Sequence, residues 1–352
     1  MCIRDRSDLA VFFLMFLSGL EMDPREIRKA GISAGILSII AFSLPLISGF
    51  GASYLLGLTL VQSLFMGLLL SITAVPVSAI VLMEFGILKS RLGTTVITAA
   101  VINDILSLIV LSVIFQLNQS GASAEIHLDQ IFDSLLKIGA FIGGIFLVDI
   151  LFRKTSHWLP KRVGPLIEKL QTKEAAFGIL LITTIVVSLI AQTIIGLHFI
   201  IGTFFSGLIV YKEIIRKQNF ERVYGIISAI TFGFFAPIFF AIIGINIQIE
   251  LIVKSIPIFI LLMAVAVLSK VGGGYIGSRL SGFSKDESLA IAYLMNGRGM
   301  VELVIASIGF AAGIIDLTLF SIAVVIGFIT TIMAPVFSRP YVTKVRSKVV
   351  TE

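Results

Sequence analysis

Ionisable side chains are rare inside the long apolar stretches of this 352-residue sequence, and the few that occur there mark where chemistry could take place. Asp104 lies near the middle of one apolar run, directly after Asn103, and Lys270 lies at a comparable depth in a later run. Arg298 and Glu302 are four residues apart, so on a helix they would share a face and neutralise each other. A charged group at the centre of a bilayer costs at least about 2.5 to 3.5 kcal/mol on insertion scales, so each of these residues needs a reason to be there.

Asp104 and Asn103 together predict a binding site for a small monovalent cation. Burial away from water disfavours the charged form of a carboxylate, so a proton and a bare cation can compete for Asp104. Asn103 is expected either to orient this carboxylate or to offer its amide oxygen. A purely structural role is the weaker reading for Asp104. Lys270 fits site electrostatics and helix packing about equally well, whereas Arg298 with Glu302 fits a structural pair better.

Two apolar runs carry residues that interrupt helices near their middles. Pro76, in Ser71-Ile72-Thr73-Ala74-Val75-Pro76, lacks a backbone N–H and clashes with the preceding turn, which frees carbonyl groups that could face an ion. Thr73 adds a hydroxyl to these oxygens, although it could instead bond to its own helix, and Pro76 could be a simple kink. The second interruption is Asn296-Gly297-Arg298-Gly299, where two glycines weaken the helix. Unwound positions in corresponding helices of two halves are the best sequence indication of a transport site.

The elements that must position these residues are membrane-spanning helices. The sequence is 57% hydrophobic and only 14% charged, whereas soluble domains carry roughly a quarter charged residues. A hydrocarbon core about 30 Å thick needs about 20 apolar residues per helix, and stretches of that length recur along the chain. We predict an all-α polytopic membrane protein with eleven spans, at about 8–22, 31–57, 61–83, 93–117, 132–152, 174–193, 197–212, 222–246, 255–279, 286–312 and 316–337.

The charges between the spans predict the topology. Every second connection is basic, as in the pairs Lys89 with Arg91 and Arg279 with Lys285, whereas the intervening ones are short or acidic. The positive-inside rule then places the C-terminal tail, 339–352, in the cytoplasm of a protein that crosses the inner (plasma) membrane many times. Residues 8–338 are expected to form one transmembrane domain. Residues 1–7 differ abruptly from the apolar run after them and are expected to be a non-native leader.

Composition also limits the other functional classes. The net charge of +6 comes from Lys and Arg in short connections rather than from one basic face, so we expect lipid and small ions as partners and no nucleic acid. A single cysteine and three histidines in separate connections give no metal or cofactor site. An intramembrane protease would need two facing aspartates or clustered His and Glu, so no enzyme is expected. A cation channel or uncoupled transporter remains the main alternative, although a single Asp without repeated filter residues argues against it.

Six motifs, in order along nearly the whole chain, resemble the monovalent cation:proton antiporter-2 family. They are Phe16-Leu17-Ser18-Gly19-Leu20-Glu21-Met22-Asp23, Thr73-Ala74-Val75-Pro76-Val77 with Gly86-Ile87-Leu88-Lys89-Ser90-Arg91-Leu92-Gly93, Ala99-Ala100-Val101-Ile102-Asn103-Asp104, Gly202-Thr203-Phe204-Phe205-Ser206-Gly207-Leu208, Phe234-Phe235-Ala236-Pro237-Ile238-Phe239-Phe240, and Met295-Asn296-Gly297-Arg298-Gly299-Met300-Val301-Glu302-Leu303.

The resemblance implies a sodium/proton antiporter fold of two inverted repeats, with two broken helices crossing near the ion site, a mobile core and a dimerisation part. It implies that Thr73, Asn103, Asp104 and Lys270 line the core, and that family members have further helices before Gly19, so this chain is expected to lack the first ones. It also implies a homodimer that exchanges Na⁺, or alternatively K⁺, for protons by alternating access. The family's ion-site pair is Asp-Asp or Asn-Asp; because Asn103 cannot form the salt bridge to Lys270 that accompanies electrogenic exchange, the Asn-Asp pair favours electroneutral exchange.

Overall fold

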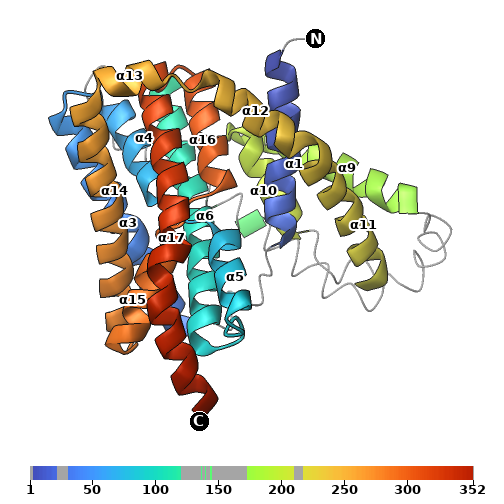
Figure 1. The fold of residues 1–352 in the computed structure, drawn as a ribbon. Coiled ribbons are helices and arrows are strands. Elements are labelled where there is room, and N and C mark those ends of the chain that lie inside the picture. Colours follow the sequence, from blue (N-terminus) through green and yellow to red (C-terminus); the bar gives the residue numbers. More distant parts are fainter. Residues whose placement is uncertain are drawn as a thin grey trace. The chain divides into compact units, whose positions relative to one another are not determined.

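The computed structural model describes residues 3–21, 31–119, 173–209 and 217–351, with a few single positions between 136 and 144. These residues form helices and turns, with no strand among them (Figure 1). Contacts divide the chain into two compact units, one of Met1–Pro24 with His127–Ile242 and one of Arg25–Ile126 with Ile243–Glu352. The span predicted at 132–152 and the basic connection after it lie outside the described residues, apart from those single positions.

The first unit is built from helices at the start and in the middle of the chain. They are α1 (Ile3–Glu21), α9 (Lys173–Ile190), α10 (Phe199–Ile209), α11 (Lys217–Ile230) and the first part of α12 (Ala236–Asn246), with π-helical turns η1 (Ala191–Ile195) and η2 (Thr231–Phe235). Its core joins α1, α9 and α11 through Phe16, Leu17, Leu20, Leu180, Val223 and Ile227. Helix α1 begins inside the stretch predicted as a leader.

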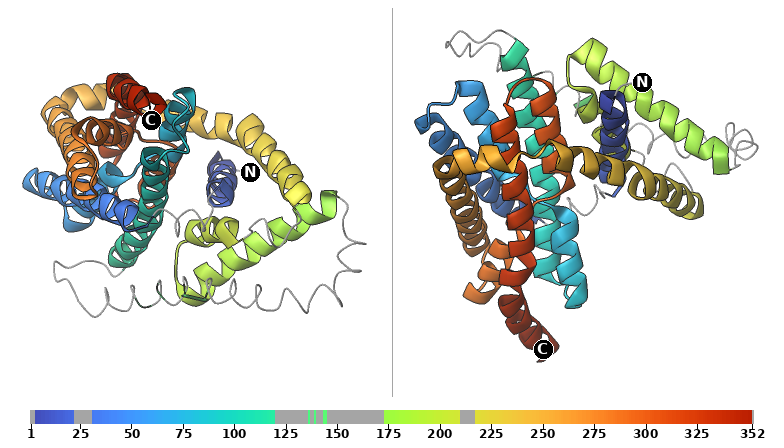
Figure 2. Two further views of the ribbon diagram at one scale, coloured as in Figure 1. Left: turned by 90° about the horizontal axis from the view of Figure 1, so that it is seen from below. Right: turned by 45° about the horizontal axis from the view of Figure 1, so that its top comes forward.

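The second unit contains every residue predicted for the ion site. Its helices are α3 (Gly31–Leu55), α4 (Leu60–Ser71), α5 (Val75–Glu84), α6 (Arg91–Gln119), α13 (Ile249–Lys254), α14 (Ile256–Leu280), α15 (Lys285–Leu294), α16 (Met300–Ala311) and α17 (Leu317–Thr351). Helix α3 packs between α14 and α4, and α15 packs against α14 and α17 (Figure 2). Helix α17 continues past residue 338, where the predicted transmembrane domain ends, into the tail predicted at 339–352.

Two predicted spans of the second unit are broken helices, as the sequence indicates. The chain is extended from Ile72 to Ala74 between α4 and α5, and Pro76 lies in the first turn of α5, where its missing N–H costs no helical hydrogen bond. Residues 295–299 separate α15 from α16, and Gly299 is extended. Both α4 and α15 begin with a capping box, so the two broken segments start in the same way and break after a similar length.

Glycines allow the helices of the second unit to approach closely. A Cβ on Gly273 would lie 3.0 Å from the carbonyl oxygen of Ile40, and one on Gly277 would lie 3.1 Å from the Cα of Leu37, both on α3. Gly67 of α4 approaches the backbone of α3 in the same way, since its Cβ would contact the carbonyl oxygen of Leu46. Small residues permit such contacts in membrane proteins, where close van der Waals packing holds helices together.

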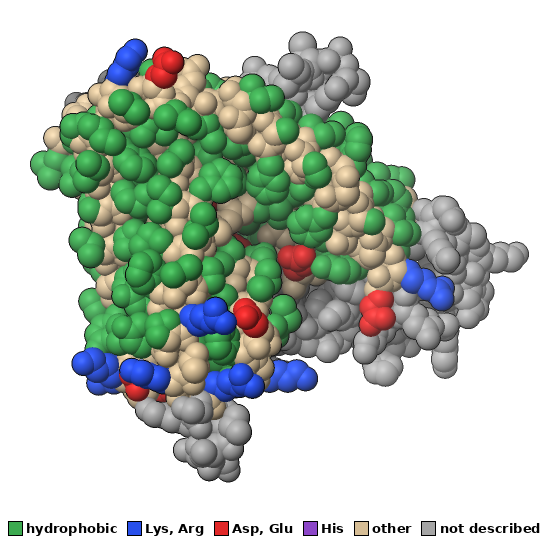
Figure 3. All heavy atoms as spheres, viewed as in Figure 1, with side chains coloured by type: hydrophobic (Ala, Val, Ile, Leu, Met, Phe, Trp, Pro, Cys, Tyr) green, Lys and Arg blue, Asp and Glu red, His purple; other side chains and the backbone are tan. Residues whose placement is uncertain are grey.

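The surface of the second unit is apolar along its helices and basic at one end. In the described part of the chain, six helical stretches are long and apolar enough to cross a membrane, namely Gly31–Leu55, Leu60–Glu84, Arg91–Asn118, Glu221–Asn246, Ile256–Leu280 and Leu317–Arg346. Arg91 donates from Nη2 to the carbonyl oxygen of Ser281 at 3.1 Å, which joins two of the predicted basic connections. In Figure 3, Lys and Arg side chains gather along the lower edge of the molecule, below a surface covered by hydrophobic side chains.

Candidate functional site

The two helix breaks cross each other and are joined through their main chains. The N–H of Ala74 donates to the carbonyl oxygen of Gly297 at 2.8 Å, so the extended segment of one break pairs with that of the other. Close approach requires glycine here, because a Cβ on Gly299 would lie 2.7 Å from the Cβ of Ala74. Ser78 of α5 donates to the carbonyl oxygen of Leu294 at 2.8 Å, which caps the end of α15. The crossing therefore depends on main-chain bonding and on small residues.

Helix α17 holds the second break in place. Thr331 Oγ1 accepts from the N–H of Arg298 at 3.3 Å and donates to the carbonyl oxygen of the same residue. The main chain of Arg298 is therefore fixed at both of its polar groups. Its side chain extends across to α4.

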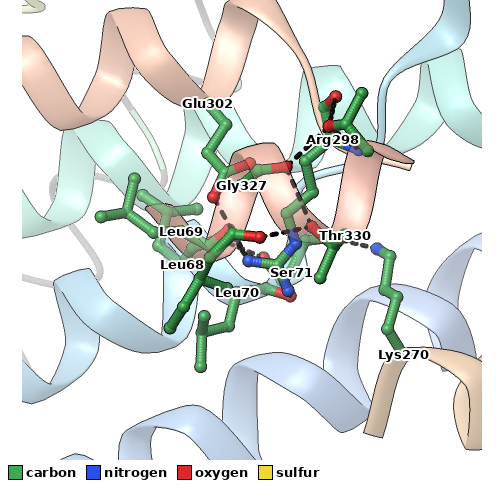
Figure 4. A network of polar contacts seen from close by, with 11 residues as sticks. Leu68, Leu69, Leu70, Ser71, Lys270, Arg298, Glu302, Gly327 and Thr330 are labelled. Carbon is green, nitrogen blue, oxygen red and sulfur yellow. Dashed lines mark hydrogen bonds and ion pairs between the residues drawn. The ribbon is translucent and has the colours of Figure 1, made fainter. Parts of the chain in front are cut away.

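Two buried cations occupy the carbonyl end of α4, in what we call the carbonyl cluster: Lys270, Arg298, Glu302 and the carbonyl groups that they meet (Figure 4). Arg298 donates to the carbonyl oxygens of Leu70 at 2.9 Å and Leu69 at 3.4 Å. Lys270 Nζ donates to the carbonyl oxygens of Ser71 and, at 3.1 Å, Ala41. The C-terminal end of a helix carries about half a negative charge, so two cations stabilise a helix end that is buried within the protein.

Glu302 completes this cluster. Its Oε1 lies 3.2 Å from Arg298 Nη1, and the side chains of both residues are at most 1% exposed. A carboxylate beside two buried cations offsets part of their charge. The predicted ion pair is therefore present, and its arginine does more than neutralise a neighbour, because it also binds the first broken helix.

A second group of buried polar side chains, the Asn103–Asp104 cluster, consists of Ser38, Thr73, Asn103 and Asp104. All four are at most 2% exposed. Ser38 Oγ donates to Asn103 Oδ1 at 2.6 Å, and Asn103 Nδ2 donates to Thr73 Oγ1 at 3.1 Å. Asp104 Oδ1 is buried but meets no hydrogen-bond partner within the described ranges. The cluster therefore presents a carboxylate oxygen whose bonding capacity is unused.

These positions refine the sequence predictions in two ways. The carbonyl groups of Leu69, Leu70 and Ser71, next to the first break, accept hydrogen bonds from Arg298 and Lys270, whereas the sequence suggests that such freed carbonyls could face an ion. The amide of Asn103 accepts a hydrogen bond from Ser38 and donates one to Thr73. The oxygen without a hydrogen-bond partner is therefore on Asp104 rather than on the amide. Pro76 lies in the first turn of α5, directly after the break.

The sequence assigns no site role to two residues, Ser38 and Asn296. Ser38 lies in the apolar run of α3, and a lone serine in such a run gives no signal until its partner on α6 is known. Asn296 is part of a quoted motif, and neither polar atom of its buried side chain has a partner in the described part of the chain. Its polar side chain within an apolar run was the available signal.

Comparison with known proteins decides the family. The family model described as "Sodium/hydrogen exchanger, transmembrane" matches residues 3–344. This chain belongs to the sodium/hydrogen exchanger family. Members of this family are transporters rather than enzymes, and the chain is accordingly a multi-pass membrane protein and a cation:proton antiporter.

Individual relatives agree over most of the chain. An Na(+)/H(+) antiporter of Enterococcus hirae is 27% identical over 343 residues, which cover 97% of this chain and 86% of that protein. The Na(+)/H(+)-K(+) antiporter GerN of Bacillus cereus is 29% identical and is covered to 80%, with 94% of this chain. The solved structure of the sodium proton antiporter MjNhaP1 from Methanocaldococcus jannaschii at pH 8 superposes with a TM-score of 0.73 at 18% identity, covering 100% of this chain and 88% of that one. The predicted antiporter fold is confirmed by this match.

Proposed function

We propose that this antiporter binds its cation and its proton in turn at Asp104. The observation that carries the proposal is the buried Asp104 Oδ1, which has no hydrogen-bond partner among the described residues and lies on the helix that packs against both halves of the first broken helix. A carboxylate in such surroundings gains from neutralisation by either a proton or a cation. Exclusive occupancy by one or the other couples their movements, provided that the site changes access only when neutralised.

The neighbouring groups support a small cation with hard oxygen ligands. Thr73 Oγ1 accepts one hydrogen bond from Asn103 and keeps a lone pair that a cation can use. Lys270 and Arg298 are held by carbonyl oxygens, which keeps two competing positive charges at the end of α4. We infer that Na⁺ is the preferred substrate. K⁺ is the alternative, because the relative from Bacillus cereus is named as an Na(+)/H(+)-K(+) antiporter.

A single carboxylate at the site favours electroneutral exchange. With an amide at position 103, one cation replaces one proton on Asp104, so no net charge crosses the membrane in a cycle. The rate of exchange should then be indifferent to the membrane potential. A rate that varies with the potential would contradict this stoichiometry.

Alternating access, dimer formation and orientation are further parts of the proposal. The broken helices and their partners in the second unit would form the mobile core, and two copies of the chain would associate as a homodimer. The basic connections that Arg91 joins to Ser281 favour a cytoplasmic location for this end and for the C-terminus, in the plasma membrane. Attaching a thiol-reactive probe to a cysteine introduced in the tail, from one side of sealed vesicles, measures this orientation.

The decisive experiment is proton flux into proteoliposomes that contain the purified chain, on addition of Na⁺ or K⁺, with the membrane potential clamped or free. Wild type is compared with Asp104→Asn and with Glu250→Gln, which alters an exposed carboxylate on α13. We expect Asp104→Asn to lose exchange by at least about 100-fold while it remains folded, and Glu250→Gln to match wild type. Exchange retained by Asp104→Asn would refute the site. Cation flux without proton movement in wild type would point to a channel or an uncoupled transporter.

A further inference from the structure

We propose that Ser38 is a positioning residue of the transport site, which fixes the orientation of the Asn103 amide and, through it, the Thr73 hydroxyl. The inference rests on the proposed function, because it takes the Asn103–Asp104 cluster as the place where the cation binds. Ser38 itself would not contact the cation. It would act by keeping the groups that do so in one arrangement.

The geometry connects three separate elements through side chains alone. Ser38 is on α3, Asn103 is on α6, and Thr73 lies in the break between α4 and α5. The two hydrogen bonds of 2.6 and 3.1 Å run in series from the serine hydroxyl through the amide to the threonine hydroxyl. All three side chains are at most 1% exposed, so water cannot replace either bond at low cost.

The chemistry of the amide makes the first bond decisive for the second. A carboxamide has an acceptor end and a donor end of nearly the same shape, and only its partners determine which end faces which way. Because Ser38 donates to Oδ1, the NH₂ group turns towards Thr73 and donates to its oxygen. Thr73 then retains a defined lone pair for a cation. Without Ser38 the amide can rotate, and the site must order itself each time a cation binds.

Burial of a hydroxyl in α3 does not by itself require such a partner. Ser53 is on the same helix and is fully buried, yet its Oγ meets no hydrogen-bond partner in the part of the chain that the structure describes. Ser53→Ala therefore removes a hydroxyl of the same kind from the same helix without touching the chain of bonds. It is the matched control for Ser38→Ala.

The test measures the apparent KM for Na⁺ and the maximal rate of Na⁺-driven proton flux in proteoliposomes. We expect Ser38→Ala to raise the KM by about 3- to 10-fold, the range that the loss of one buried hydrogen bond gives, with the maximal rate changed less than about 2-fold. Ser53→Ala should leave both values unchanged. Ser38→Thr, which keeps a hydroxyl, should restore a KM within about 2-fold of wild type. An unchanged or lowered KM for Ser38→Ala would overturn the proposal, since a lowered KM would mean that Ser38 withholds a ligand.

A double-mutant cycle separates positioning from packing. In a Thr73→Val background the bond to Asn103 is already lost, so Ser38→Ala should then change the KM by less than about 2-fold. Independent, multiplicative effects would indicate that Ser38 acts only through packing and would overturn the proposal. Asp104→Asn in the same assay keeps the two hypotheses apart. Lost exchange there with an unchanged KM for Ser38→Ala refutes only the role of Ser38, whereas retained exchange refutes the proposed site itself.

Discussion

The carbonyl cluster and the Asn103–Asp104 cluster lie in the same unit and are both buried, but their polar groups are used very differently. In the carbonyl cluster, the cations of Lys270 and Arg298 bind main-chain oxygens of the broken helix and its neighbour, and Arg298 also pairs with Glu302. In the Asn103–Asp104 cluster, the amide is bonded at both ends while Asp104 Oδ1 has no partner among the described side chains. The first cluster pairs its opposite charges internally, although Glu302 Oε2 and Arg298 Nε have no hydrogen-bond partner among the described residues, and the second keeps an oxygen of Asp104 available for an external ion.

This difference separates stability from transport within one site. Removing one member of a buried ion pair leaves its partner buried and uncompensated, which destabilises the fold. Removing a carboxylate that has an unused oxygen leaves no such partner at that atom. Substitutions in the carbonyl cluster should therefore act first on folding, and substitutions of Asp104 should act first on exchange.

The largest effect that tests this comparison is expected from Arg298→Met. The change strands the Glu302 carboxylate and the carbonyl groups of Leu69 and Leu70, at a cost of about 3 to 5 kcal/mol. Thermal unfolding of the detergent-purified protein should show a large fall in Tm, or no folded protein at all, whereas Asp104→Asn should unfold at or above the wild-type temperature.

A paired substitution controls for the loss of arginine as such. Arg298→Met with Glu302→Gln removes both charges together and should recover part of the lost stability. If Arg298→Met alone were as stable as wild type, the carbonyl cluster would not be what stabilises the fold of this unit.

A smaller effect is expected at the crossing that supports both clusters. Gly299→Ala brings a methyl group to 2.7 Å from the Cβ of Ala74 and should cost about 1 to 3 kcal/mol, with a slower exchange rate. Gly35→Ala on α3 is the control, because a Cβ there meets nothing within 4 Å and should be neutral or stabilising. Tm and proton flux measure both. Equal behaviour of the two variants would show that the crossing tolerates more space than its contacts indicate.

The smallest effect is expected at a helix start outside both clusters. Ser284 caps α15 by accepting from the N–H of Glu287, so Ser284→Ala should lower stability by about 1 kcal/mol and leave the KM for Na⁺ unchanged. Ser255, at the start of α14, makes no such side-chain bond, and Ser255→Ala should leave the Tm unchanged. A changed KM in Ser284→Ala would mean that the start of α15 influences the break at the other end of the same helix.

The sequence is sufficient to predict the broken helices because their causes are local. Pro76 and the glycines around Arg298 disrupt helices through their own backbone properties, and the two breaks occur where these residues predict them. The spacing of Arg298 and Glu302 likewise predicts a pair that is 3.2 Å apart in the structure. The capping boxes at Thr59 and Ser284 also have local causes, since each has a hydroxyl residue with Gln or Glu three positions later.

The partners across helices could not be predicted in the same way. Which carbonyl groups accept from Lys270 depends on how α14 packs against α3 and α4, and no local pattern encodes that packing. The bond from Ser38 to Asn103 joins residues that are 65 positions apart, through a serine that looks ordinary in its own helix. The roles assigned to these residues in transport remain predictions for the experiments above.

The hydrogen bond from Ala74 to Gly297 uses main-chain atoms only, and this has an evolutionary consequence. The N–H of position 74 and the carbonyl group of position 297 do not depend on side-chain chemistry, although the close contacts at both positions favour small side chains. Mutations that alter ion-facing side chains can therefore leave this connection between the two broken helices intact, provided that positions 74, 297 and 299 keep small residues. Related proteins can therefore differ in the ion that they prefer while they keep the same main-chain hydrogen bond between the two broken helices.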